Sequence, residues 1–464
     1  MNRVAPADEE EFPAFVETII VGAGACGLTA ALAVQDAGGE ALVLERDESP
    51  SGSTSMSSGF IPAAATRWQR DEGIDDDPGL FLEDIQRKSH DRSDPEVAAE
   101  VVEAIGPALE WLEDEHGIPF EVLDGFLYPG HSRRRMHAVP ERTGEALLTR
   151  LLQAVMAAGI PVMTGARVTT LFTDEDDRIV GVEIERPDGG AEQIGCGSLI
   201  LACNGYGGNR EMVAANIPAM AEAEYHGHAG NTGDAVLWGE ALGAELRDLT
   251  ACQGHASLAT PHRILVTWAL MMEGGIQVNL NGERFANEHQ GYSEQAVDVL
   301  RQPDGVAFDV YDGRLHALGL EFPDYRDAVN AGAARSAPTV EALAAEIGVP
   351  ADRLAAAIAE TAGQGIDRFG RDLSGTPALE APFYAVRVTG ALFHTQGGLA
   401  VDREARVLRT DGTSFPNLLA AGGAAVGVSG PDISGYLSGN GLLTAVALGR
   451  IAGETAVAAA AQNR

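Results

Sequence analysis

The glycine pattern Gly22-x-Gly24-x-x-Gly27 is the feature that most constrains how this chain can fold. It follows a continuous apolar run at Thr18–Val21 and opens an alanine-rich segment that reaches about Ala37. The run is typical of a buried parallel strand, and the segment is typical of a helix. In such a unit the first glycine permits a tight turn, the second lets the backbone approach a phosphate, and the third lets the helix pack on the strand. Because the start of the helix attracts phosphate groups, the pattern predicts a dinucleotide-binding site, with a glycine-rich turn that binds no nucleotide as the alternative.

A second apolar run, Ala41–Leu44, completes a βαβ unit and ends at Glu45. Glu45 stands 18 positions after Gly27. An acidic residue at this spacing accepts hydrogen bonds from the ribose hydroxyls of a dinucleotide. We therefore expect an α/β fold with a doubly wound parallel sheet.

The rest of the chain divides into a continuation of this domain and an insertion. We expect helices at Pro95–Glu115 and Thr143–Ala158, a loop over 51–59, a loop followed by a helix over 231–247, and an apolar helix from about Gly441 to Ala460. We expect strands at Arg167–Phe172, Ile179–Glu185, Ala191–Ile194, Ser198–Ala202 and Leu418–Ala421. Residues from about 253 to 390 mix short strands and helices. The predicted domains are 1–252, the first part of the dinucleotide-binding domain; 253–388, an inserted α+β cap; and 389–464, the C-terminal part of the dinucleotide-binding domain.

Charge and cysteine content narrow the classes of partner. The 464 residues include 68 acidic and 32 basic side chains, a net charge of −36, which disfavours nucleic acids and anionic membrane surfaces. The four cysteines have neither metal-ligand nor secreted-disulfide spacing, so we expect reduced thiols and no metal site. The acidic first eleven residues lack a signal-peptide core, and no apolar run reaches the roughly 18 residues of a membrane span. We expect a cytoplasmic protein without a membrane span.

Further motifs identify a family. The serine-rich segment Gly52–Gly59, the stretch Leu199–Gly205 and the late stretch Leu418–Gly423 resemble the fumarate reductase and 3-ketosteroid dehydrogenase superfamily of flavoproteins. Further stretches similar to this superfamily are Gly233-Asp234, Gly243-Ala244, Asn281–Glu288, His394–Gly398 and Ser438–Leu442. The resemblance runs from Thr18 to Gly453 and implies a Rossmann-like FAD-binding domain with an inserted α+β cap. One departure is Gly423, which stands where the family usually has Glu.

The resemblance implies FAD as the cofactor, held without a covalent bond because residues 51–59 contain no histidine. The residues expected to bind it come from the glycine-rich turn, the serine-rich segment and the late strand-to-helix stretches. They are Gly22, Gly24, Ala25, Cys26, Gly27, Glu45, Arg46, Ser53, Thr54, Ser55, Ser58, Gly59, Val168, Ala202, Asn204, Gly205, Asp234, Gly422, Gly423, Ser438, Gly439, Gly441 and Leu442.

Two tyrosines stand where fumarate reductases have arginines. Tyr292 takes the place of the proton-donating Arg, and ketosteroid Δ1-dehydrogenases have a Tyr there that is thought to abstract the substrate proton. Tyr436 takes the place of an Arg that clamps a substrate carboxylate. A buried dicarboxylate would lack counter-charges beside two phenols, so the exchange favours a ketone substrate with at most one carboxylate. A tyrosine packed under the inserted domain is the alternative reading of Tyr292.

Three other candidates follow from the resemblance. His394, in His394–Gly398, and His255, in Gln253-Gly-His255, match substrate-binding histidines of fumarate reductases, although single histidines are often structural. Tyr384 matches a segment in which ketosteroid dehydrogenases carry an active-site Tyr. The cluster Arg133–Arg135, with His131 and His137, is either a solvated loop or a guide for an anionic substrate.

The resemblance implies an oxidoreductase that moves a hydride between a substrate carbon and the flavin. We expect FAD-dependent α,β-desaturation of a cyclic ketone, either a 3-ketosteroid or a smaller ring such as an oxocyclohexane carboxylate. The expected site lies between the FAD domain and the cap. Tyr292 would take the α-proton, while Tyr436 and His394 polarise the carbonyl. The alternatives are reduction of an enoate or dicarboxylate, and a flavin-bearing electron carrier without its own substrate. The sequence given contains no heme or iron–sulfur motif, so we expect the electrons to pass to an unidentified acceptor.

Overall fold

The computed structural model describes residues 3–7, 12–123, 127–363 and 365–461, and the chain divides into two compact units. The first unit comprises Met1–Met212, Gly227–Ala251 and His394–Arg464, and the second comprises Val213–His226 and Cys252–Phe393. The predicted domains assigned 213–226 and 389–393 to the first unit. They belong to the second because strand β11 (Glu224–Tyr225) pairs in parallel with β18 (Phe383–Thr395) at Ala391 and Leu392.

A sheet of nine strands organises the first unit. Its centre is β2 (Phe15–Val21), which pairs in parallel with β3 (Ala41–Leu44) on one side and with the end of β10 (Ala191–Leu201) on the other. Strand β21 (Ser414–Ala420) continues the parallel order beyond β10, and β7 (Val162–Met163) continues it beyond β3. The last four residues of β2 and all of β3 are buried, as expected of continuous apolar runs in a parallel sheet. The predicted α/β fold is confirmed.

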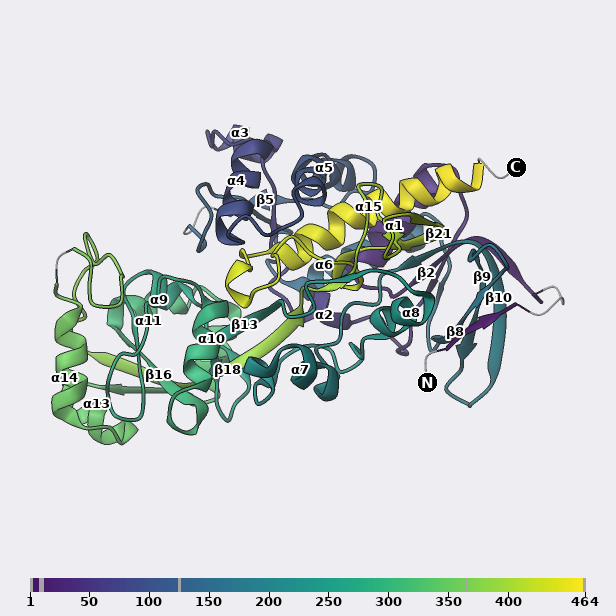
Figure 1. Ribbon diagram of the computed structural model, residues 1–464. Coiled ribbons are helices and arrows are strands. Elements are labelled where there is room, and N and C mark those ends of the chain that lie inside the picture. Colours follow the sequence, from purple (N-terminus) through teal and green to yellow (C-terminus); the bar gives the residue numbers. More distant parts are fainter. Residues whose placement is uncertain (1–2, 8–11, 124–126, 364, 462–464) are drawn as a thin grey trace. The chain divides into compact units, whose positions relative to one another are not determined.

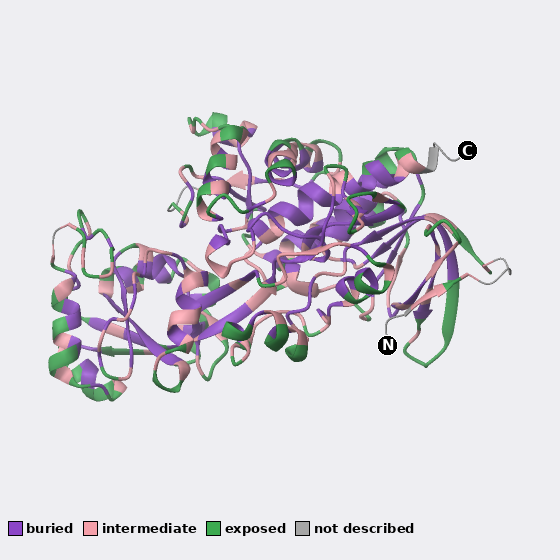
Figure 2. Ribbon diagram, in the orientation of Figure 1, coloured by how far each residue is buried: buried purple, intermediate pink, exposed green. Residues whose placement is uncertain are grey.

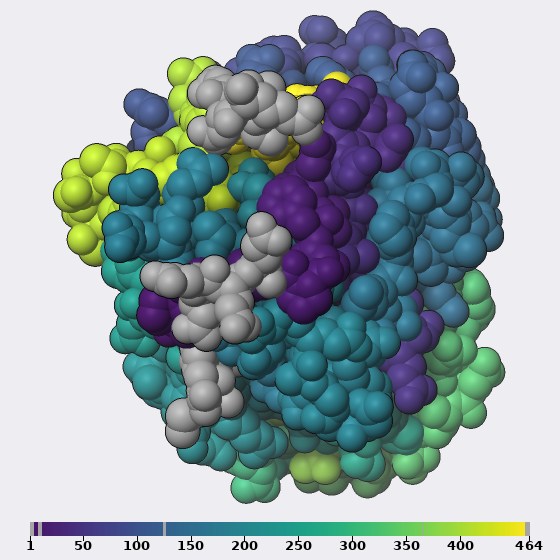
Figure 3. All heavy atoms as spheres, turned by 90° about the vertical axis from the view of Figure 1, so that its right-hand side faces the viewer, coloured from purple at the N-terminus to yellow at the C-terminus, as the bar shows by residue number. Residues whose placement is uncertain are grey.

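The sheet extends into an antiparallel layer. The first half of β10 pairs with β9 (Ile179–Glu185), and β9 pairs with β8 (Arg167–Thr173). The two strands predicted over 191–202 are one continuous strand. Figure 3 shows the surface at this end of the first unit. The N-terminal β1 (Arg3–Pro6) pairs in parallel with β8.

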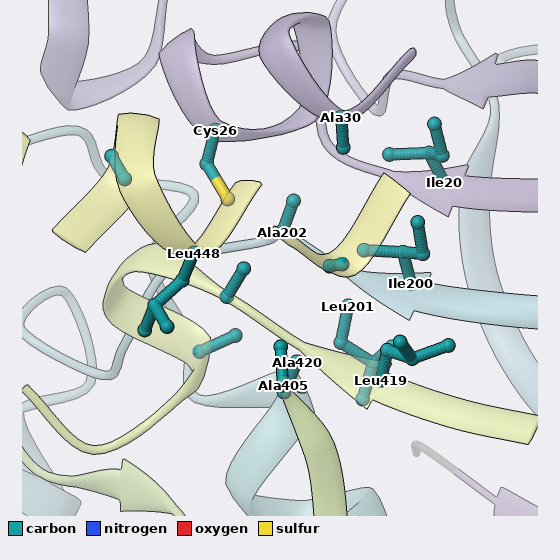
Figure 4. Packing of buried hydrophobic residues seen from close by; sticks show 14 of the residues in the cluster. Ile20, Cys26, Ala30, Ile200, Leu201, Ala202, Ala405, Leu419, Ala420 and Leu448 are labelled. Atoms are coloured by element: carbon teal, nitrogen blue, oxygen red, sulfur yellow. The ribbon is translucent and has the colours of Figure 1, made fainter. Parts of the chain in front are cut away.

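Helices α1 (Ala25–Asp36) and α15 (Asn440–Ala461) pack closely within the first unit, as Figure 1 shows. A Cβ on Gly449 would lie 2.7 Å from the carbonyl oxygen of Cys26, and one on Gly453 would lie 2.5 Å from that of Ala30. Only glycine permits this approach of two helix backbones. Cys26 points from α1 into the core that these helices share with β10 and β21 (Figure 4).

Helix α15 corrects the expectation that no apolar segment is long enough for a membrane span. Residues Asn440–Ala459 have the length and composition of such a span, with a mean hydropathy of 1.4. However, 61% of this segment is buried inside the protein, and a core helix has the same composition. Its packing on α1 accounts for the apolar character.

The remaining elements of the first unit are short, apart from two long helices. Helices α5 (Pro95–Asp114) and α6 (Gly144–Ala157) agree with the predicted ranges. The predicted loop over 51–59 contains a short helix, α2 (Gly52–Ser55), because Ser51 and Gly52 carbonyls accept hydrogen bonds from Ser55. The others are β4 (Ile61–Pro62), α3 (Arg67–Asp71), α4 (Pro78–Lys88), β5 (Glu121–Val122), β6 (Met136–Ala138), α7 (Arg210–Asn216, which ends in the second unit), α8 (Asp234–Leu242), β12 (Leu246–Arg247), β19 (Gly398–Leu399) and β20 (Arg406–Leu408).

The second unit is an α+β structure around β18. Strands β13 (Cys252–Ala259), β14 (Ile264–Leu265), β15 (Ile276–Val278), β16 (Val306–Asp312) and β17 (Ala334–Ala337) join β11 and β18 in one sheet. Strand β16, which lies between β18 and β15, is buried throughout, while the outer helices are exposed on one side (Figure 2). Helices in this unit are α9 (Ala269–Met272), α10 (Tyr292–Leu300), α11 (Gly313–Gly319), α12 (Pro323–Asn330), α13 (Val340–Ile347) and α14 (Ala351–Glu360).

Candidate functional site

The glycine-rich turn in the first unit is packed so tightly that larger residues would not fit. Gly22 has φ +109°, and a Cβ there would lie 2.5 Å from the carbonyl oxygen of Ala202. A Cβ on Gly27 would lie 1.9 Å from the carbonyl oxygen of Gly22. The first and third glycines therefore have the turn and packing roles that the pattern predicts.

The N-terminus of α1 is built to receive an anion. Gly24 caps the helix without a side chain, and no acidic residue stands in the first turn. The N–H of Ala25 donates to Thr54 Oγ1 at 3.0 Å. The intrahelical ladder begins at Leu28. The N–H groups of Cys26 and Gly27 thus lie in a first helical turn that carries no acidic residue, which suits a diphosphate.

Glu45 lies directly after β3 and is held by the backbone. One carboxylate oxygen accepts from the N–H of Ala23 at 2.9 Å, and the other accepts from that of Asp47 at 3.0 Å. Each oxygen keeps a further lone pair, so the carboxylate can also accept from ribose hydroxyls. The next residue, Arg46, donates to the carbonyl of Gly230 at 2.6 Å.

The serine-rich segment is joined to the loops that follow β10. The hydroxyl oxygen of Ser53 accepts from the amides of Asn204 at 3.1 Å and Asn231 at 2.9 Å. Asn204 has φ +64°, and its side-chain oxygen accepts from the N–H of Gly205 at 2.8 Å. Ser55 donates to its own turn, and Ser58 and Gly59, with φ +73°, end the segment.

The remaining predicted cofactor residues come from four other segments of the same unit. Val168 is buried in β8, and the N–H of Ala202 donates to the carbonyl of Val21. The carboxylate of Asp234 accepts from the hydroxyl of Thr232 at 3.0 Å. The late glycines are equally close-packed, since a Cβ on Gly423 would lie 2.1 Å from Asn204 Oδ1. Gly422, Ser438, Gly439, Gly441 and Leu442 lead from the end of β21 to the first turn of α15.

These features fit FAD. The close-packed glycines, the bare start of α1 and the carboxylate of Glu45 provide a backbone surface, a phosphate site and a ribose acceptor. All of them belong to one unit. Residues of α1 and Glu45 would hold the adenosine diphosphate portion. When bound, the flavin supplies an acceptor or donor of hydride.

His394 and Tyr436 lie together in the first unit. Their rings meet edge to face, with centroids 5.6 Å apart. Nδ1 of His394 lies 3.0 Å from the amide nitrogen of Gln396, and burial lowers the pKa of His394 to about 4. A Cβ on Gly441 would lie 2.9 Å from Nε2. This pair provides a neutral imidazole and a phenol at the start of α15.

His255 and Tyr292 lie together in the second unit, within a group of aromatic rings. His255 stacks on Tyr292, with centroids 4.8 Å apart, and on Phe393, with centroids 5.3 Å apart. Trp268 meets the His255 ring edge to face at 6.0 Å. The N–H of Ser257 donates to Nδ1 of His255, and burial lowers the pKa of His255 to about 3. The His255 imidazole is therefore also uncharged at neutral pH.

The structure separates Tyr384 from this aromatic group, contrary to the expectation that it shares the site. Tyr384 stands nine residues before Phe393 on β18, which corresponds to about 30 Å along an extended strand. Its ring stacks on His316 at 4.3 Å and on Tyr311 at 5.8 Å. The continuous strand leaves no bend that would bring Tyr384 back to the His255 group.

The motif Asn281–Glu288 has a structural role that supports Tyr292. The Glu288 carboxylate accepts from Arg284 at 2.6 and 2.9 Å and from Arg371 at 3.0 Å, and all three side chains are buried. It also accepts from the backbone N–H of Gln277 in β15. The buried ion pairs anchor the segment that leads into α10, which begins at Tyr292.

The basic cluster Arg133–Arg135 is built into the first unit. Arg135 is fully buried and paired with Asp76 at 2.8 Å and with Asp84. Arg133 donates to the carbonyls of Asp75 and Ser132. Arg135 is therefore a structural residue, and the sequence-based choice between a solvated loop and an anion guide missed its burial.

Three residues in these groups, Gln396, Trp268 and Phe393, were not predicted from the sequence as site residues. Gln396 stands in the His394–Gly398 motif, and its spacing from His394 was the available signal. Trp268 and Phe393 show no pattern that distinguishes them from core aromatics. Phe393 lies beside His255 because β18 pairs with β13, whereas Trp268 stands at the start of α9.

Comparison with known proteins supports the cofactor assignment. Residues 17–442 match the family described as the FAD binding domain. A probable fumarate reductase, Ifc3, from Shewanella frigidimarina is 29% identical over 95% of this chain and 74% of its own length. A 4-oxocyclohexanecarboxylate 2-dehydrogenase from Sinomonas cyclohexanicum is 26% identical over 96% of this chain and 93% of its own length.

Solved structures agree. The open conformation of a flavocytochrome c3 fumarate reductase matches 97% of this chain and 79% of its own, with 27% identity and a TM-score of 0.81. A 3-ketosteroid-Δ4-(5α)-dehydrogenase from Rhodococcus jostii RHA1 matches 98% of this chain and 99% of its own. At 24% identity and a TM-score of 0.79, the latter shows the fold. The chain belongs to the FAD binding domain family and is an FAD-dependent oxidoreductase similar to fumarate reductases and ketosteroid dehydrogenases.

Proposed function

We propose that this protein desaturates the α,β C–C bond of a cyclic ketone, and that the ketone carries at most one carboxylate. The observation that carries the proposal is the neutral character of both candidate groups. His394 with Tyr436 and His255 with Tyr292 provide imidazoles and phenols, and burial keeps both imidazoles unprotonated at pH 7. Arg133 and Arg135 of the basic cluster are engaged with backbone carbonyls or buried aspartates.

The proposed roles follow from the hydrogen-bonding capacity of each group. Tyr292 takes the proton from the carbon next to the carbonyl, and the hydride leaves the adjacent carbon for the cofactor. His394 and Tyr436 donate hydrogen bonds to the ketone oxygen, which stabilises the negative charge that develops there as the proton leaves. One C=C bond forms as two C–H bonds break, so proton and hydride balance.

The substrate class is narrowed by the relative named as a 4-oxocyclohexanecarboxylate dehydrogenase, which matches over most of both chains. We propose a six-membered ring ketone of this kind ahead of a 3-ketosteroid. A second candidate is reduction of an enoate or dicarboxylate, which the similarity to the probable fumarate reductase favours. An electron carrier without its own substrate is the third outcome of the test below, and each requires a separate redox partner.

The test is an anaerobic titration of the FAD-loaded protein, followed by the flavin absorbance. 4-Oxocyclohexanecarboxylate, 4-androstene-3,17-dione and succinate are added in separate experiments. We expect bleaching by the ring ketone and a new enone absorbance. Bleaching by succinate alone would establish the dicarboxylate reaction, and no bleaching by any of them would favour the carrier.

A variant links the reaction to Tyr292. Tyr292→Phe keeps the ring that stacks on His255 but removes the hydroxyl. We expect bound FAD to be retained and the rate of bleaching to fall by a factor on the order of 10²–10⁴. Tyr384→Phe is the matched control in the same unit, and we expect it to bleach at the wild-type rate. An unchanged rate in Tyr292→Phe would contradict the role given to Tyr292.

A further inference from the structure

Gln396 connects His394 to two buried polar residues of the first unit. Its amide nitrogen lies 3.0 Å from Nδ1 of His394, and its amide oxygen accepts from the hydroxyl of Ser429 at 2.7 Å. The Ser429 oxygen accepts from the amide nitrogen of Asn440 at 3.1 Å. Gln396, Ser429 and Asn440 are 4%, 1% and 0% exposed. Three hydrogen bonds thus run in series from the start of α15 to the imidazole.

The direction of donation in this series fixes where the imidazole carries its proton. An amide nitrogen only donates, so Nδ1 of His394 must accept. A neutral imidazole with an accepting Nδ1 carries its proton on Nε2. Because burial lowers the pKa of His394 to about 4, the ring is neutral at pH 7 and presents Nε2–H as a donor.

A second group beside Nδ1 favours the opposite tautomer. The backbone carbonyl of Thr395 lies 3.3 Å from Nδ1, and a carbonyl only accepts. The contact with Gln396 is shorter and determines the tautomer while the amide is present. Without the amide, the Thr395 carbonyl is the remaining hydrogen-bonding group at Nδ1 among the described residues. The proton would then move to Nδ1, and Nε2 would become an acceptor.

We propose that Gln396 is a positioning residue that selects the Nε2–H tautomer of His394 and so makes this histidine a donor to a substrate oxygen. Nε2 faces Gly441 in the first turn of α15, where the absence of a Cβ leaves room for the ring. A donor at Nε2 is what stabilisation of an enolate oxygen requires, whereas an acceptor there would repel it. The identity of that oxygen rests on the proposed function, but the selection of the tautomer does not.

Two other histidines of the first unit provide internal references for the measurement. Nε2 of His131 lies 2.9 Å from the carbonyl of Ser438, which requires the proton on Nε2. Nδ1 of His137 lies 2.7 Å from the carbonyl of Arg135, which requires the proton on Nδ1. Burial lowers the pKa of each to about 4, so both rings are neutral at pH 7.

The test is the ¹⁵N NMR spectrum of FAD-loaded protein labelled at the histidine ring nitrogens, with His394 assigned by its loss in His394→Ala. In the wild-type protein we expect His394 to show the tautomer pattern of His131. In Gln396→Met, which replaces the amide with an apolar side chain of similar length, we expect the pattern of His137. The same pattern in both proteins would overturn the proposal.

Measurements of activity distinguish the proposed role of Gln396 from a purely structural one. We expect Gln396→Met to lower kcat with the ring ketone about 100-fold, the size of effect seen when one oxyanion donor is lost. In the His394→Ala background, Gln396→Met should have no further effect. Equal losses in both backgrounds would mean that Gln396 acts without His394, which overturns the proposal.

Two further measurements keep the outcomes separate. If Gln396→Met fails to fold, Gln396→Met with Ser429→Ala removes the unpaired hydroxyl and is used in its place. If the wild-type protein does not oxidise the ketone, the proposed function fails, and the ¹⁵N spectrum still decides the role of Gln396. A His131-type pattern in wild type with a His137-type pattern in the variant supports the inference in either case.

Discussion

His394 in the first unit and His255 in the second are both held neutral by burial, but by different kinds of partner. At His255 the donor to Nδ1 is the backbone N–H of Ser257, at 3.1 Å, which has no alternative orientation. At His394 the donor is the side chain of Gln396, which depends on Ser429 for its own orientation. Both arrangements favour Nε2–H, yet only the one at His394 can be changed by a single side-chain substitution.

The surroundings of the two rings differ as well. His255 stacks face to face on Tyr292 and Phe393, with interplanar angles of 22° and 20°, so its ring is part of a packed aromatic group. His394 meets Tyr436 edge to face, with an interplanar angle of 73°, and its Nδ1 lies 3.0 Å from the amide nitrogen of Gln396. We infer that His394 contributes chiefly to the rate of reaction, and His255 chiefly to the stability of the second unit.

The largest expected effect tests the His394 side of this comparison. His394→Ala removes the proposed donor to the ketone oxygen, so we expect kcat to fall about 10²–10³-fold. We expect a smaller change in the free energy of unfolding than at His255, because the His394 ring meets Tyr436 edge to face and is not stacked between two rings. Stopped-flow flavin reduction and urea unfolding measure the two quantities, and a stability loss without a rate loss would reverse the assignment.

The next effect tests the His255 side. We expect His255→Ala to lower the free energy of unfolding by about 2–3 kcal/mol, because it opens a cavity and removes two stacked ring contacts. His255→Phe restores a flat ring of similar size and should recover most of the loss. Urea unfolding of both variants measures this. If His255→Phe is as unstable as His255→Ala, the contribution of His255 to stability comes from its ring nitrogens and not from stacking.

The pH dependence of stability gives a smaller effect that both histidines share. Their folded-state pKa values, about 3 for His255 and about 4 for His394, lie below the ordinary value of 6.5. Between these limits the unfolded chain binds more protons, so stability is full above pH 6.5 and is lost as the pH falls. Through each histidine, the free energy of unfolding should be about 2 kcal/mol lower at pH 5 than at pH 8.

A variant isolates the share of His255. Between pH 8 and pH 5, the free energy of unfolding of His255→Phe should fall by about 2 kcal/mol less than that of the wild-type protein. Urea unfolding at the two pH values measures the difference. An unchanged difference would mean that His255 is not buried in its neutral form.

The sequence predicts the regular parts of the fold well because local patterns determine them. The apolar runs at Thr18–Val21 and Ala41–Leu44 became adjacent parallel strands, since a run without polar positions must be covered on both faces. The glycine pattern likewise predicted the close contact between Gly27 and the carbonyl of Gly22.

The sequence could not predict relationships that depend on distant pairing. The segment 213–226 joins the second unit because Glu224–Tyr225 pairs with the end of β18. Tyr384 lies far from His255 because β18 runs unbroken for 13 residues. Ser429, which donates to Gln396, stands 33 positions from it in the chain, and Asn440, which donates to Ser429, stands 44 positions from Gln396. Resemblance to a family motif can assign a residue to a predicted site. The neighbours of that residue in the folded protein depend on the length of its strand and on hydrogen bonds to residues far away in the sequence.

The smallest expected effect concerns Gly441, in the first turn of α15. Gly441→Ala should by itself stabilise the helix by somewhat less than about 1 kcal/mol, because glycine is a poor helix former. However, the new Cβ would lie 2.9 Å from Nε2 and 3.0 Å from Cε1 of His394, so the imidazole must turn away. We expect a near-zero net change in the free energy of unfolding and about a tenfold loss of kcat, with the His255 group unaffected. FAD content and the ¹⁵N signals of both histidines provide the control. A shift at His255, or an unchanged His394 with unchanged kcat, would contradict the separation of roles between the two histidines.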